Sequence, residues 1–526
     1  MHRPFVAYRS GTLDLAQNSQ RPDTCDAHVN TSLTAFHFCT IRYGARNVGY
    51  GESVASHSSY HSSHVIARRP FLASTILLLA LGGCAGVPSP PDAKVELPSQ
   101  WRHADALATD APKPDLHDWW RTFGDAGLDR LVDAALAQNL GVAEATYRLR
   151  AARARAGQTE KRFLPSLGAR TLSAPNVEST ASYFQTGFDA LWEIGWFGRH
   201  DSETSLSGAG TGAAQTELAA AQVSVVAEVV RTYVELRAAQ ALHALATRTA
   251  DLDRALVAQL ERRVALQLAA SVDVEKARQT LVLDEARAAA RAQAIDQAAT
   301  ALARLLGRTD IDPSWLDNGA MLVAPASIAI AAPADLLRTR PEIRRAEWEV
   351  QKAAAELGIA RADMYPQLTL GGTLTYASKI DGDKLLDSQK IFSLGPLLNV
   401  PLFDWGMRRA AMVAHGELLS AAVTAYRQSV IEGVAEVENA LGALAASRTH
   451  LDAVNAAFDA GRRQATQTAR LRELGLADAL DAGTVTAAVV QAEAERVEAQ
   501  AATALAVVAL YKSLGGAPLP MEQPPS

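Results

Sequence analysis

Few residues in this 526-residue chain have the types and spacing that covalent catalysis needs. The three cysteines are Cys25, Cys39 and Cys84, so the chain beyond residue 84 has no disulfide framework and no cysteine-ligated metal site. The later histidines form no close pair of metal ligands; they are His103, His117, His200, His243, His415 and His450. The sequence contains no nucleophile elbow, Walker loop or metal motif. We therefore expect no enzymatic activity, no catalytic residue, no metal and no cofactor.

Residues 208–213 (GAGTGA) mimic the glycine fingerprint of a dinucleotide-binding turn. They follow a predicted strand and open a long predicted helix, however, and no βαβ unit surrounds them. The matching stretch of the second half, which starts at Gly416, keeps only the first glycine. We expect no nucleotide site here.

Cys84 is the one cysteine in a recognisable chemical context. It follows Phe71–Leu81, a short apolar run that is preceded by Arg68 and Arg69. The run is too short for a transmembrane helix, which needs ~20 residues, but it fits a secretory signal. Residues 81–84 (LGGC) resemble a bacterial lipobox, in which the cysteine carries a covalent lipid and becomes the mature N-terminus. The alternative is a buried cysteine after a core helix.

These features divide the N-terminal part of the chain. We expect a lipoprotein signal at residues 65–83, followed by a lipid anchor and proline-rich linker at residues 84–116. Residues 1–64 do not resemble the rest of the chain. Because such signals work from the N-terminus, we expect these residues to be a mis-annotated or non-native extension, with translation starting near Val65.

The chain after the linker repeats itself. Residues 163–167 (FLPSL) match residues 364–368 (MYPQL), an offset of 201. Further on, Glu228 matches Glu436 and Asp273 matches Asp481, both at an offset of 208. We expect a tandem duplication with repeats at 117–307 and 333–516, joined by a linker at 308–332 and followed by a tail at 517–526.

Both repeats are built from the same sequence of elements. Each begins with an amphipathic helical segment, at 127–161 in the first repeat and from Pro341 in the second. Two strands come next in each, predicted at 166–176 and 181–198, and at 367–378 and 390–406. Each repeat then returns to long helices, and we expect helix–helix turns at 266–273 and 474–481.

Composition and strand number limit the function. The net charge of −6 gives no reason to expect nucleic acid as a partner. Four membrane-grade strands are too few to close a barrel, since the smallest outer-membrane barrels need about eight. If the strands enter a membrane, several chains must share one barrel, because an open sheet in lipid leaves backbone groups unpaired.

Four stretches resemble bacterial outer-membrane efflux lipoproteins of the NodT type, relatives of TolC. They are residues 119–136 (WWRTFGDAGLDRLVDAAL), 192–199 (WEIGWFGR), 333–350 (PADLLRTRPEIRRAEWEV) and 357–368 (LGIARADMYPQL). The chain has Gly195 where this family usually has an acid. The resemblance implies a mainly α fold with a β-barrel part: four transmembrane strands per chain, long helical hairpins, a homotrimeric 12-stranded barrel and a periplasmic tunnel.

The resemblance also implies partners and sites. It implies a periplasmic adaptor (membrane fusion protein) and an inner-membrane RND pump, with small toxic compounds or drugs leaving across the outer membrane. Asp478 and Asp481 match gate aspartates, and three-fold symmetry would make each a ring; the alternative is ordinary helix caps. Arg470 and Arg472 are weaker candidates for bracing the closed gate. The turn residues Leu266, Leu474, Gly475 and Leu476 are expected either to meet the adaptor or to pack the hairpin ends.

Two other functions remain open at this point. One is an exit duct for type I protein secretion. The other is a non-channel periplasmic coiled-coil scaffold, which explains the helices but not the paired strands that recur in both repeats.

Overall fold

The computed structural model describes residues 88–89, 94–103, 116–174, 182–325, 328, 333, 339–381 and 384–516. All of them belong to one contact unit, Ser74–Ser526. The predicted signal at 65–83 and Cys84 lie outside the described residues. None of the described helices is long and apolar enough to cross a membrane.

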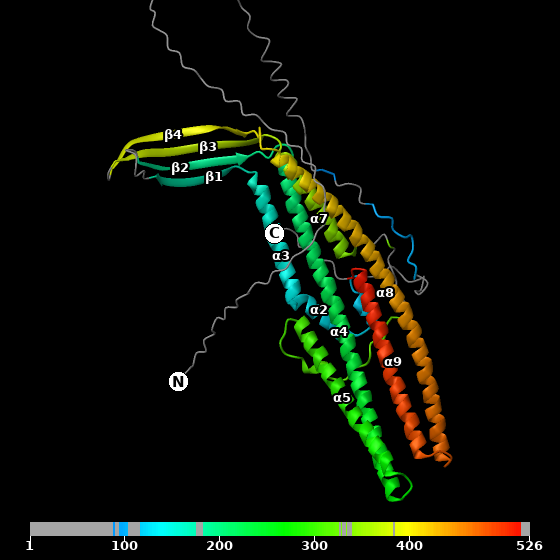
Figure 1. Cartoon of the computed structure of the whole chain (residues 1–526). Helices are drawn as coiled ribbons and strands as arrows, with labels where there is room; N and C mark the ends of the chain where they lie inside the picture. Colours follow the sequence, from blue (N-terminus) through cyan, green and yellow to red (C-terminus); the bar gives the residue numbers. More distant parts are fainter. Residues whose placement is uncertain are drawn as a thin grey trace, which may run out of the picture. The chain divides into compact units, whose positions relative to one another are not determined.

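The two repeats contain the same order of elements, helix, two strands and a helical hairpin (Figure 1). The first repeat comprises η2 (Trp119–Phe123), α2 (Ala126–Gln138), α3 (Leu140–Arg162), β1 (Ser166–Ala174), β2 (Ser182–Glu193), α4 (Arg199–Ala265) and α5 (Ser271–Leu305). After η3 (Pro313–Trp315), the second comprises α7 (Pro341–Ala362), β3 (Gln367–Asp381), β4 (Lys384–Asn399), α8 (Met407–Glu473) and α9 (Ala479–Ser513). The predicted duplication and mainly helical class are confirmed.

The hairpins of the two repeats have equal dimensions. Helices α4 and α8 each have 67 residues, and α5 and α9 each have 35. Helix α4 packs against α5, and α8 against α9. The turns fall at residues 266–270 and 474–478, inside the predicted ranges.

The four strands form one antiparallel sheet in the order β1-β2-β3-β4 (Figure 1). The registers place side chains in rows across the sheet, because successive residues of a strand point to opposite faces. One row joins Phe188, Leu374 and Phe392, which are all exposed. The opposite face carries polar rows such as Asp189, Thr373 and Ser393. The sheet thus has one apolar face and one polar face.

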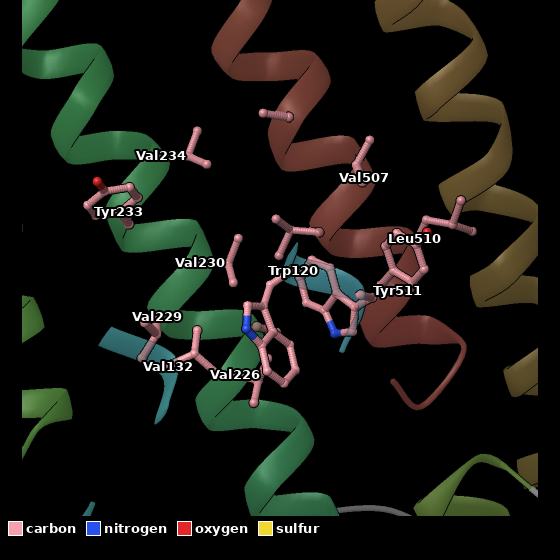
Figure 2. Close-up of a cluster of buried hydrophobic side chains, with 14 of the residues drawn as sticks. Trp120, Val132, Val226, Val229, Val230, Tyr233, Val234, Val507, Leu510 and Tyr511 are labelled. Atoms are coloured by element: carbon pink, nitrogen blue, oxygen red, sulfur yellow. The ribbon is translucent and has the colours of Figure 1, made fainter. Parts of the chain in front are cut away.

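The largest core lies where the repeats meet. Helix α4 contributes Val226, Val230 and Tyr233, and α9 contributes Val507, Leu510 and Tyr511, with Trp120 and Val132 beside them (Figure 2). The ring of Trp119 stacks on that of Tyr511 with centroids 4.9 Å apart. Trp119 Nε1 donates a hydrogen bond to the carbonyl oxygen of Gly516 at 3.2 Å. This core fixes the two hairpins to each other.

The predicted helical segment at 127–161 is in fact two helices. The backbone of Asn139 is extended (φ −62°, ψ 127°) and separates α2 from α3. Its Oδ1 accepts hydrogen bonds from the amides of Gly141 and Val142, which caps α3. Its Nδ2 donates to the carbonyl oxygen of Leu305 at 2.8 Å. The break is therefore held by the end of α5, far away in sequence.

The start of α4 also differs from the prediction. The helix begins at Arg199 rather than near residue 213, so residues 208–213 lie inside it. Glycine is costly in a helix, but Gly212 has a packing reason: a Cβ built there would lie 2.3 Å from the ring of Trp348 in α7. This glycine allows close helix contact.

The strand bounds shift for a similar local reason. Strand β2 ends at Glu193 rather than 198, because Gly195, Phe197 and Gly198 adopt positive φ values and form a turn. Strand β4 covers Lys384–Asn399 rather than 390–406, and a matching turn at Trp405 and Gly406 precedes α8.

Candidate functional site at the hairpin turns

The two hairpin turns share one backbone conformation. Leu266 and Leu474 cap α4 and α8, and the next residues, Gln267 and Gly475, take left-handed φ values of 57° and 70°. Glycine adopts this conformation without the steric cost that a side chain adds. The first turn therefore carries backbone strain that the second does not.

Large apolar side chains project from both turns. Leu266 and Leu474 are 68% and 72% exposed, and Leu476 is 73% exposed. Side chains this exposed contribute little to packing of the hairpin ends within one chain. The predicted turn residues are thus available on the surface of the protomer, and their contact with an adaptor stays a prediction.

Asp478 lies between the hairpins at the start of α9. Its Oδ1 accepts a hydrogen bond from the amide of Ala479, at 2.5 Å. Its Oδ2 accepts a hydrogen bond from Arg263 Nη1 in α4 at 2.7 Å. The carboxylate therefore caps the start of α9 in the second hairpin and forms an ion pair with α4 of the first hairpin.

This environment affects the ionisation of Asp478. The hydrogen bond from Arg263 is the main cause, and it holds the pKa of the Asp478 carboxyl below its usual value. In a single chain the shift is thus downward.

The other predicted gate residues lie close by. Asp481 is in the first turn of α9, one helical turn after Asp478 and exposed. Arg470 and Arg472 are in the last turn of α8 and are also exposed. Within the described residues, Asp478 pairs with Arg263 and not with these two arginines. Sequence reasoning missed Arg263 because its partner lies 215 positions away in the other repeat.

An apolar cluster lies next to this ion pair. Val257 and Leu260 of α4 pack with Val274 and Ala277 of α5, all at least nine-tenths buried. Leu480 of α9 packs against the same cluster. The first hairpin thus has an apolar core near its turn, and one leucine of the second hairpin rests on it.

A pair of acids forms a second polar feature, farther from the turns. Asp253 of α4 and Asp284 of α5 line a cavity of about 600 Å³ that α9 also borders. Asp253 is 9% exposed, and its Oδ2 has no hydrogen-bond partner among the described residues. Arg287 Nη1 donates to Asp284 Oδ1 at 2.5 Å.

Two facing carboxylates favour the protonated form of one of them. Burial, together with the neighbouring Asp284, raises the pKa of Asp253 to about 6. The described residues contain no group of three or more acidic, histidine or cysteine side chains that could hold a metal ion. Asp253 therefore loses its proton at a higher pH than an ordinary aspartate does.

Comparison with known proteins identifies the family. The family model described as outer membrane efflux protein matches residues 131–308 and 332–516. The outer membrane protein OprJ of Pseudomonas aeruginosa is 30% identical over 393 residues, covering 72% of this chain and 81% of OprJ. Nodulation protein T of Rhizobium leguminosarum bv. trifolii is 26% identical, covering 70% of this chain and 80% of that protein.

Solved structures of outer-membrane channels have a similar fold. The outer-membrane channel OprN has a TM-score of 0.70 and 27% identity, covering 82% of this chain and all of that one. The Neisseria gonorrhoeae MtrE outer-membrane channel has a TM-score of 0.71 at 23% identity, covering 83% and 99%, and shows the shared fold. Members of this family are channels rather than enzymes. The chain belongs to the outer membrane efflux protein family, as a NodT-like, TolC-fold efflux channel of the outer membrane.

Proposed function

We propose that the chain is the exit duct of a tripartite efflux pump and works as a homotrimer. Three copies would close one 12-stranded barrel in the outer membrane, and their hairpins would form a periplasmic tunnel. An adaptor and an inner-membrane RND pump would feed cargo into it.

The four-stranded sheet is the observation that carries the proposal. It has one apolar and one polar face, which suits a wall between lipid and an aqueous pore. Strands β1 and β4 end the described sheet, each with one strand neighbour. In lipid, their unpaired backbone groups would cost several kcal/mol each. Pairing β4 of one copy with β1 of the next removes that cost.

The hairpin turns supply a gate in this proposal. Asp478 and Asp481 of three copies would form two rings of negative charge, which attract cations and oppose anions. The ion pair of Asp478 with Arg263 holds the second hairpin to the first and keeps the rings narrow. Arg470 and Arg472 would add positive charge beside the rings.

The exposed turn leucines supply the docking surface for the adaptor. Leu266, Leu474 and Leu476 project where a helical hairpin of the adaptor could cover them. Gly475 lets the second turn close tightly at its positive φ. A lipid on Cys84 would tether each chain to the outer membrane.

The proposed cargo is small organic compounds. Relatives carry names such as toluene efflux pump outer membrane protein TtgI of Pseudomonas putida, 29% identical over 390 residues. Another is the fusaric acid resistance protein FusA of Burkholderia cepacia, 28% identical over 364 residues. These names favour small-molecule efflux over protein secretion for this chain too.

Planar bilayers test the channel and its gate together. We expect the purified full chain to form cation-selective pores, and Asp478→Ala with Asp481→Ala to raise single-channel conductance. Pores whose conductance does not change in the double variant would refute the gate. Absence of any pore activity would refute the duct. Deleting the protein should also raise the host's sensitivity to small toxic compounds.

A further inference from the structure

The cavity between the hairpins, about 600 Å³ in volume, lies where α4 packs against both α5 and α9 (Figure 1). Its volume falls within the range of small-molecule sites in proteins, about 300–1,000 Å³. Helix α4 contributes Asp253 to its lining, and α5 contributes Asp284 and Arg287. None of the described turn residues lines it. The cavity is therefore separate from the residues that the proposed gate and docking surface use.

Asp253 is the acid of this cavity that lacks a basic partner. It is 9% exposed, and its Oδ2 accepts no hydrogen bond from the described residues. Within the described part of the chain Asp253 forms no ion pair, whereas Asp284 is paired with Arg287. A buried carboxylate without a partner costs free energy. A cation in the cavity would remove that cost.

Two arginines also line the cavity, but each already has an acidic partner. Arg287 pairs with Asp284, and Arg291 Nη2 donates a hydrogen bond to Glu498 Oε1 of α9 at 2.9 Å. The two arginine side chains are 72% and 45% exposed, so water screens their charges. They therefore neither supply a partner for Asp253 nor strongly repel a cation beside it.

The uncharged polar side chains of the lining present hydrogen-bond acceptors. Thr249 and Thr280 each donate to the backbone carbonyl oxygen four residues earlier, at 3.1 and 3.2 Å. Gln491 Nε2 donates to Glu495 Oε1 at 3.3 Å. The hydroxyl lone pairs and the amide oxygen of Gln491 are left to accept. A ligand that fits these groups must donate hydrogen bonds.

The rest of the wall is largely apolar. Leu242 of α4 and Val490 of α9 are buried, and Leu245, Ala246 and Ala494 lie beside them in the lining. These side chains offer no hydrogen bonds, but they gain from contact with an apolar group. The fitting ligand therefore combines a cationic donor with an apolar part.

The second hairpin shows that the acid pair is not needed to build a hairpin. At the offset of 208, Asp253 corresponds to Gly461 and Asp284 to Ala492. A Cβ built on Gly461 would lie 3.7 Å from the side chain of Val489, an ordinary packing distance. The two hairpins nevertheless have equal lengths. The buried acids therefore serve something other than the helix geometry.

We propose that this cavity binds a small organic cation, an ammonium group joined to an apolar ring or short chain. The ammonium would donate to Asp253 Oδ2 and to the acceptors around it, and the apolar part would cover the aliphatic wall. A metal ion suits the cavity less, since the described residues hold no group of three acidic, histidine or cysteine side chains. The ligand would contact both hairpins, because α9 belongs to the second. This site goes beyond the proposed exit duct and does not depend on it.

Calorimetric titration of the full chain in detergent with phenethylamine tests the site. We expect saturable binding after subtraction of a titration into detergent alone. Phenethyl alcohol has the same ring and no charge. It should bind at least about tenfold more weakly, because it cannot pair with the Asp253 carboxylate.

Two variants separate the charge from the apolar wall. Asp253→Asn keeps the shape of the side chain and should weaken amine binding by about tenfold or more. Ala246→Leu leaves both acids in place but fills part of the cavity, so it should weaken binding of both probes. The control is Asp251→Asn on the same helix, whose carboxylate accepts a hydrogen bond from Arg254 outside the lining. It should bind both probes as the parent does.

Competition with protons gives a second measurement. Because the pKa of Asp253 is about 6, its affinity for phenethylamine should rise by about tenfold between about pH 5 and about pH 7.5. The ionisable groups that face it are Asp284, Arg287 and Arg291, all on α5, and the described lining from α9 has none. The two arginines stay charged throughout this range. Asp253→Asn should lose the dependence.

Equal binding of the amine and the alcohol, or unchanged amine binding in Asp253→Asn, would overturn the inference. Displacement of the amine by magnesium chloride at matched ionic strength would also overturn it, since the acid pair would then be a metal site. A chain that forms pores but binds no amine leaves the exit duct intact. A chain that binds the amine but forms no pores leaves the cation site intact.

Discussion

The two hairpins have the same lengths but differ at their turn ends. Near the first turn, α4 carries Val257 and Leu260, both 8% exposed. At an offset of 208, α8 has Ala465 and Thr468 instead. On the return helices, buried Val274 corresponds to Ala482. The two repeats thus share the geometry of the hairpin, whereas this apolar cluster is present near the turn of the first hairpin and not at the matching positions of the second.

This difference assigns unequal mechanical roles. Apolar burial stabilises by about 25 cal/mol per Å², so the first hairpin is held shut by its own core. The second hairpin has smaller side chains there, and at its turn end Asp478 and Leu480 both contact the first hairpin. We therefore expect the first hairpin to act as the fixed support during gating, and the turn end of the second to be the element that moves.

The largest expected effect comes from removing the core of the first turn. Leu260→Ala should destabilise the end of this hairpin by about 2–5 kcal/mol, because a cavity remains. The matched change in α8 is Thr468→Ala, which should change the stability of the end of the second hairpin by less than about 0.5 kcal/mol. Hydrogen exchange of the amides near each turn measures both. Equal effects would mean that the two ends are held alike.

The acid pair should make the stability of the first hairpin depend on pH near 6, where the second hairpin has no matching acid pair. The pKa of Asp253, about 6, lies above the ordinary value of 3.8. Its contribution to stability is therefore complete below the ordinary value and is lost as pH rises through about 6. We expect the hairpin to lose about 1–3 kcal/mol on this rise.

Asp253→Asn should remove that pH dependence, as measured by hydrogen exchange corrected for the intrinsic rate. The matched position in α8 is Gly461, so the second hairpin supplies an internal control. A first hairpin that keeps its pH dependence in the variant would contradict this origin.

Exchanging the residues with positive φ at the two turns should change the stability of the turns in opposite directions, by about 1 kcal/mol each. Gln267→Gly relieves the strain of a left-handed side-chain residue, and Gly475→Gln introduces it. Limited proteolysis at each turn should slow in the first variant and accelerate in the second. A change of the same sign in both would show that backbone strain does not distinguish the turns.

The smallest effect on stability is expected from the ion pair between the hairpins. Arg263 and Asp478 are 32% and 47% exposed, so Arg263→Ala should cost less than about 1 kcal/mol. Its effect should appear instead as higher channel conductance, because the turn end of the second hairpin loses one of its contacts with the first hairpin. The neighbouring exposed arginine provides the control, and Arg262→Ala should leave conductance unchanged.

The pH dependence of this link has the opposite sign to that of Asp253. Because the pKa of Asp478 is lowered, the link is complete above the ordinary aspartate value of 3.8 and is lost only as pH falls through the lowered pKa. Conductance should therefore show no contribution from it between about pH 7 and about pH 5. A step in this range that Arg263→Ala abolishes would contradict the assignment.

Much of the fold could be predicted because duplication repeats its signals. The constant offset of 208 predicted equal hairpins, and both turns lie where the pattern changes. The start of α4 could not be predicted, since residues 208–213 are rich in glycine, which disfavours a helix, and the packing of Gly212 against Trp348 is a contact with a distant part of the chain. The break at Asn139 is equally non-local, because the end of α5 holds its side chain.

The candidate site was only partly predictable, because part of it also depends on contacts between residues far apart in the sequence. Asp478 could be found because it follows a turn and begins a helix, which local sequence reveals. Arg263 and the burial of Asp253 depend on which helix faces which, and periodicity alone does not give that. Local chemistry was therefore predictable, and pairing between the hairpins was not.

The uninterrupted length of α4 and α8 has a mechanical consequence. Each helix has 67 residues and runs from a strand junction to a hairpin turn without a break. At ~1.5 Å per residue each is a rod of about 100 Å. A tilt of about 3° at the strand end displaces the turn by about 5 Å, so in the proposed trimer leverage alone would change the aperture between the turns of the three copies. Opening of such a channel would then need no helix to unfold, because the angle of the helices at the strand end would set how far the turns separate.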